Sequence, residues 1–68
     1  MTIVGWIIQE TKDQDGKQFV RWFGQYGFED EARRATFFHA KKTAETAVEN
    51  LEKGNPSRVL KILKVIAE

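Results

Sequence analysis

The sequence predicts a small α+β domain in which an antiparallel sheet packs against one helix. Two segments rich in β-branched and aromatic residues flank an Asp15-Gly16 dipeptide, which is typical of a β-hairpin. From Ala40 onward the apolar residues recur with the period of a helix instead of a strand. Because 68 residues cannot divide their burial between two cores, we expect a single domain over residues 1–68.

The hairpin is predicted in detail by its turn. Ile3–Glu10 is apolar, β-branched and too short for a stable helix, so it is expected to be a strand. Asp15 and Gly16 tolerate the positive φ angles that a type I′ turn requires. Counting outward from this turn predicts four cross-strand pairs: Gln14 with Lys17, Thr11 with Val20, Glu10 with Arg21, and Ile8 with Phe23.

The second strand carries aromatic residues on both of its faces. Phe19, Arg21 and Phe23 are expected to point one way, and Val20 and Trp22 the other. A chain this small must bury most of its large apolar side chains to be stable. We therefore expect Phe19, Trp22 and Phe23 to lie mainly in the core.

The strand is expected to lose its regularity after residue 23. Gly24 and Gly27 interrupt the pattern, which predicts that Tyr26 and Phe28 lie on a bend and not in a continued ladder. Residues 35–38 (ATFF) can form either a short third strand or a helical turn.

The helix is the most clearly marked element. Ala40 begins an apolar stripe at helical spacing, and Gly54 offers a left-handed C-terminal cap before Pro56. The tail, residues 58–68, is ambiguous. Asn55-Pro56 can begin a second helix, whereas the four β-branched residues of the tail favour a strand. The alternative fold is therefore a β-hairpin followed by two or three helices.

One resemblance favours a strand for the tail. The order of an apolar strand, a Gly-turned aromatic strand, the segment A35-T-F-F-H-A-K-K-T-A44, a helix, and V59-L-K-I-L-K-V65 resembles small orphan proteins of phages and mobile elements. The resemblance implies a β-β-(β)-α-β domain with the helix on one sheet face. His39 departs from that pattern, in which Ser or Asp precedes the helix. With Lys41 and Lys42 following it, either the helix begins later or this end has another task.

Composition argues against catalysis and against bound cofactors. The chain has no cysteine, and His39 is its only histidine, so no metal site is predicted. Ser57 is the only serine, and no spacing brings it to a base. We expect no enzyme, no catalytic residue, no metal and no cofactor.

The expected environment is the cytoplasm, that of the host if the chain is phage encoded. No apolar stretch approaches the ~20 residues that span a bilayer, so no membrane association is predicted.

The leading hypothesis is a small non-enzymatic protein that binds a host protein and modulates or inhibits it. Exposed aromatic residues beside charges make good docking surfaces. The candidate protein-binding residues are Trp6, Arg21, Trp22, Tyr26 and Phe28. The resemblance implies a phage or mobile-element origin, and by analogy an anti-defence role such as CRISPR inhibition.

Two alternatives stay open. The first is nucleic-acid binding by a basic cluster at the helix start: Arg33, Arg34, His39, Lys41 and Lys42. The net charge is only +1, and residues 29–31 can neutralise the arginines, so solvated charges are the simpler interpretation. The second is a structural homo-oligomer, such as a homodimer, built by pairing of sheet edges.

Overall fold

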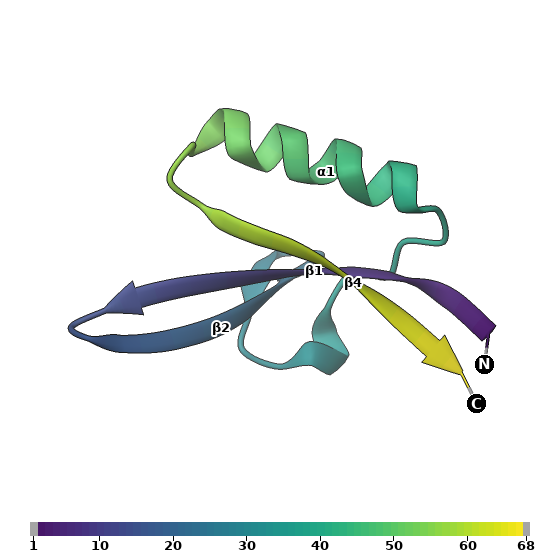
Figure 1. The fold of residues 1–68 in the computed structure, drawn as a ribbon, viewed down its shortest axis with the longest axis horizontal. Helices are drawn as coiled ribbons and strands as arrows, with labels where there is room; N and C mark the ends of the chain where they lie inside the picture. Colours follow the sequence, from purple (N-terminus) through teal and green to yellow (C-terminus); the bar gives the residue numbers. More distant parts are fainter. Residues whose placement is uncertain (1, 68) are drawn as a thin grey trace.

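The computed structural model describes residues 2–67 and confirms the α+β fold. The elements are β1 (Thr2–Gln14), β2 (Lys17–Gly24), β3 (Gly27–Glu29), the 3₁₀ turn η1 (Ala32–Arg34), α1 (Lys41–Gly54) and β4 (Val59–Ala67). The strands form one antiparallel sheet in the order β3-β2-β1-β4. In Figure 1, α1 lies on one side of this sheet and the connector carrying η1 on the other. The tail is a strand, and so the alternative with two or three helices is wrong.

The predicted turn and most of the predicted register are confirmed. Asp15 and Gly16 have φ angles of 53° and 79°, as a type I′ turn requires. Pairing runs from Gln14–Lys17 through Thr11–Val20 and Glu10–Arg21 to Gln9–Trp22. Ile8 and Phe23 are not among the pairs of this ladder, because another segment enters between the strands there.

That segment is residues 36–38. The Thr36 N–H donates to the Phe23 carbonyl (2.7 Å), while Phe38 exchanges two backbone hydrogen bonds with Trp6 (2.8 Å each). Ala35 forms a further bridge to Gly24. The segment that could have been a third strand therefore makes isolated bridges, and it continues the sheet beside β1 where β2 has ended.

The prediction of a bend after residue 23 is confirmed for Tyr26 and wrong for Phe28. Gly24 and Gly27 flank a tight turn, and Gly27 has a φ of 121°, which a residue with a side chain rarely adopts. The chain reverses there and forms β3, in which Phe28 pairs with Phe23. Tyr26 does lie in the turn, with 88% of its surface exposed.

The helix begins at Lys41, and Ala40 is its N-cap without a side-chain hydrogen bond. The structure therefore supports the first explanation for His39, namely that the helix begins later in the chain. The predicted left-handed cap at Gly54 is wrong, since Gly54 is the last helical residue and is not among the glycines with positive φ. Asn55 ends the helix in an extended conformation, which its position before Pro56 favours.

The core lies between α1 and one face of the sheet. Ile8 of β1 and Ala44 of α1 are completely buried, and Glu10 lies on the same face as Ile8. Trp22 and Phe23 are half-buried, on opposite faces. Phe19 is 48% exposed, contrary to expectation, because it lies near the hairpin tip while α1 contacts β1 and β4.

Candidate functional site

The sheet face opposite α1 presents apolar side chains to solvent. Strand alternation and the observed register place residues of β2, β1 and β4 side by side on it. We call this surface the open face, and its apolar members are Ile7, Val20, Trp22, Val59 and Leu63. Val20 and Val59 are 44% and 63% exposed, and both flank Thr11 in one cross-strand row.

The η1 connector covers one end of the same face. The Phe37 ring packs over Gly5, where a Cβ atom would lie only 2.2 Å from the ring Cζ. The Arg34 carbonyl lies close over Gly24 in the same way, 2.8 Å from where a Cβ atom would be. Both glycines therefore let the connector approach the sheet, and the open face is confined to the hairpin half.

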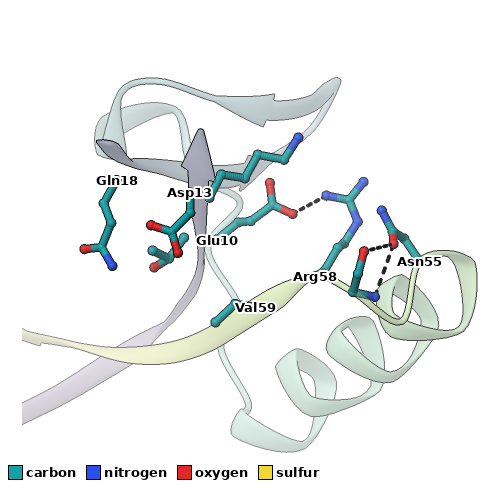
Figure 2. A pocket seen from close by; sticks show the side chains of 9 residues that line it. Glu10, Asp13, Gln18, Asn55, Arg58 and Val59 are labelled. Carbon is teal, nitrogen blue, oxygen red and sulfur yellow. Dashed lines mark hydrogen bonds and ion pairs between the residues drawn. The ribbon is translucent and has the colours of Figure 1, made fainter. Parts of the chain in front are cut away.

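A polar cluster lies on the helix side. Glu10 is 1% exposed and accepts a hydrogen bond from Nη1 of Arg58, with which it forms an ion pair. The Arg58 guanidinium also stacks over the Phe28 ring, 4.6 Å from its centroid. Figure 2 shows Glu10 and Arg58 pointing toward each other beside the end of α1. Arg58 thereby ties the α1–β4 loop to both the centre and the edge of the sheet.

Arg21 joins this cluster from the next strand. It stands directly opposite Glu10 in the ladder, and its Nη2 donates to the Phe28 carbonyl at 3.1 Å. Its Nε lies 3.7 Å from Oδ1 of Asp30. Oε1 of Glu10 and Nε of Arg21 are buried without a hydrogen bond, so the Glu10 carboxylate depends chiefly on Arg58.

A cavity of about 370 Å³ lies beside this cluster, and Figure 2 shows its lining. Ser57 lies in its wall, and its hydroxyl donates to Oδ1 of Asn55 at 2.7 Å. The Asn55 side chain also accepts the backbone N–H of Ser57 at 3.2 Å. These two hydrogen bonds fix the conformation of the loop after Pro56, and the Ser57 hydroxyl is engaged in one of them.

The five predicted protein-binding residues do not share one surface. Trp6, Arg21 and Phe28 lie on the side of the sheet that faces α1, and all three are partly covered. Trp22 belongs to the open face, and Tyr26 projects from the β2–β3 turn. Val20 and Val59 were not singled out from the sequence, although the alternation along β2 already placed Val20 beside Trp22.

The basic cluster is divided between two elements. Arg33 and Arg34 lie in η1, whereas Lys41 and Lys42 form the first turn of α1. Arg33 forms an ion pair with Glu31. The ring of His39 packs edge-on against Phe37, with 5.0 Å between the ring centroids. One of the four arginine and lysine side chains is thus neutralised locally, and the His39 ring is engaged with a neighbouring ring.

Residues 2–67 contain neither a cluster suited to a metal ion nor a helix suited to cross a membrane. No group of three acidic or histidine side chains there is arranged to hold a metal ion. No helix in that part of the chain has the length and apolar character needed to cross a membrane.

Comparison with protein-family models, curated proteins and solved structures found no match to this chain.

Proposed function

We propose that the chain is a non-enzymatic interaction domain that binds a host protein through the open face and thereby modulates or inhibits it. The observation that carries this proposal is the uncovered apolar row of Val20 and Val59 on the face that α1 does not reach. Apolar side chains on a rigid sheet, beside a half-buried Trp22, resemble the anchors that dominate binding at protein interfaces.

The resemblance to phage and mobile-element proteins supplies the biological setting of this proposal. A small domain that acts by occupying a surface of a host protein needs no catalytic chemistry. Anti-defence activity, including inhibition of a CRISPR effector, is one form that such binding takes.

Two neighbouring residues of β2 provide a matched test. Val20 and Phe19 are exposed to similar extents, 44% and 48%, but point to opposite faces of the sheet. We expect Val20→Asp to weaken binding of the partner more than tenfold, because it places a charge in the apolar contact. Phe19→Asp, with the same new charge, should change the affinity less than about threefold, as is usual for residues outside an interface.

The partner is first recovered with the tagged wild-type chain from host lysate, with and without nuclease. Its affinity for both variants is then measured with purified components by calorimetry. Equal weakening by the two variants would remove the open face as the docking surface.

Loss of recovery after nuclease would favour the nucleic-acid alternative. In that case affinity should fall steeply with salt, because each phosphate contact releases counterions. Charge reversal at Arg34 and Lys41, which have no ion pair among residues 2–67, would then abolish binding. A flat salt response would exclude this alternative.

A further inference from the structure

The free edge of the sheet is formed by β4. Its nine residues pair with β1 on one side, and no strand among residues 2–67 pairs with it on the other. An edge of this length without proline presents a row of backbone donors and acceptors that another strand can use. From its geometry we propose that β4 pairs antiparallel with β4 of a second copy, so that two chains form one continuous sheet.

The direction of the free backbone groups follows from Trp6. Its N–H and C=O both bond to Phe38, on the side of β1 away from β4. In an antiparallel pair of strands, two residues directly opposite each other either exchange backbone hydrogen bonds or both direct their N–H and C=O groups away from the partner strand. Lys64, which is opposite Trp6, therefore points its N–H and C=O to the free edge, and alternation assigns the same direction to Leu60, Ile62 and Ile66.

One register uses all of these groups. A two-fold axis at Leu63 places Ile62 opposite Lys64 of the second copy and Leu60 opposite Ile66, so that residues 59–67 overlap completely. In this register no lysine faces a lysine, because Lys61 is opposite Val65. Ile66, 46% exposed in the single chain, gains an apolar neighbour, and Val59, 63% exposed, meets Ala67.

The self-complementary register favours a second copy as the occupant, and the chain exposes more surface than a compact monomer of its size. The chain exposes 5244 Å². A compact monomer of 7.9 kDa is expected to expose about 4,400 Å². The chain thus exposes roughly 800 Å² more than this expectation, and Val59 and Ile66 of β4 are among its exposed apolar residues. The pairing does not rest on the proposed docking of a host protein, although Val59 and Leu63 of β4 belong to the open face as well.

Lys64 allows the edge to be tested without breaking the β1–β4 ladder. Lys64→Pro removes an outward N–H, whereas Lys64→Ala removes the side chain and keeps that N–H. By sedimentation equilibrium we expect dimers for the wild type and for Lys64→Ala. For Lys64→Pro we expect the dissociation constant of the dimer to rise roughly tenfold or more. The dimer loses two hydrogen bonds, because the substitution occurs in both copies. Circular dichroism establishes that each variant is folded.

A cysteine variant tests the register independently, since the chain has no cysteine of its own. Leu63 faces itself across the proposed axis as a non-hydrogen-bonded pair, at a Cα separation of about 4.5 Å that a disulfide can span. Leu63→Cys should therefore oxidise to a covalent dimer, whereas Val65→Cys, which faces Lys61, should not.

A wild-type chain that sediments as a monomer at 100 µM would overturn the proposal. So would a folded Lys64→Pro variant with unchanged dimer affinity. If Lys64→Pro does not fold, equal disulfide formation by the two cysteine variants decides against the register.

Discussion

Replacing Arg58 with alanine is expected to lower the free energy of unfolding by about 3 kcal/mol. Arg58 is the ion-pair partner of Glu10, whose side chain is 1% exposed, and its removal leaves a carboxylate buried without compensation. The stacking of the guanidinium on Phe28 is lost as well. A domain of this size has only ~3–10 kcal/mol in total. Urea unfolding followed by tryptophan fluorescence should therefore show most of the stability gone.

Two controls show whether the loss of stability comes from leaving a charge buried without a partner. Arg33→Ala breaks the exposed pair with Glu31 and should cost roughly 0.5 kcal/mol or less. Removing both partners, Glu10→Leu with Arg58→Leu, should recover much of the loss because no charge stays buried alone. If Arg58→Ala costs no more than Arg33→Ala, the buried pair does not stabilise the fold.

The second large effect is expected at Gly5. Its added Cβ in Gly5→Ala would lie 2.2 Å from the Phe37 ring and 2.7 Å from the Phe38 carbonyl oxygen. The ring can turn aside, but the carbonyl is held by the two hydrogen bonds between Phe38 and Trp6. We expect Gly5→Ala to lower the free energy of unfolding by about 2–3 kcal/mol, as overpacking does in well-packed sites.

Gly54 is the matched control for this substitution. A Cβ there meets no atom within 4 Å, and the residue is helical, so Gly54→Ala should stabilise the chain by about 0.5 kcal/mol. Both variants are compared by thermal and urea unfolding. A Gly5→Ala variant as stable as the wild type would mean that the connector does not press against β1 in solution.

The sequence was most informative where the signals are local. Asp15-Gly16 predicted the turn, and the turn predicted the opposition of Glu10 to Arg21, because a two-residue loop leaves one register. Helical spacing after Ala40 predicted α1 in the same way. The resemblance, and not periodicity, decided in favour of a strand for the tail.

Prediction failed at two places, one local and one where distant segments compete for the same backbone groups. One failure is local: Gly24 and Gly27 read as breaks in the pattern, although they permit the reversal that makes β3. The sequence leaves residues 35–38 open between a short strand and a helical turn, and the place of residues 36–38 between Phe23 and Trp6 depends on where β1 and β2 separate. No local pattern contains that information.

The candidate site shows the same division. Alternation along β2 assigned Phe19, Arg21 and Phe23 to one face and Val20 and Trp22 to the other, as observed. It could not say which face α1 would cover. The predicted protein-binding residues are consequently divided between a covered face and an open one.

The sequence by itself determined the alternation within each strand, the hairpin register and the helix that follows Ala40, because these depend on residues close together in the chain. Only the tertiary structure decided that Glu10 and Arg58, 48 positions apart, would meet in the core. It likewise left β4 at a free edge and Val59 beside Thr11 on the open face. Strand order and helix placement set these outcomes, and both depend on contacts between residues far apart in the sequence.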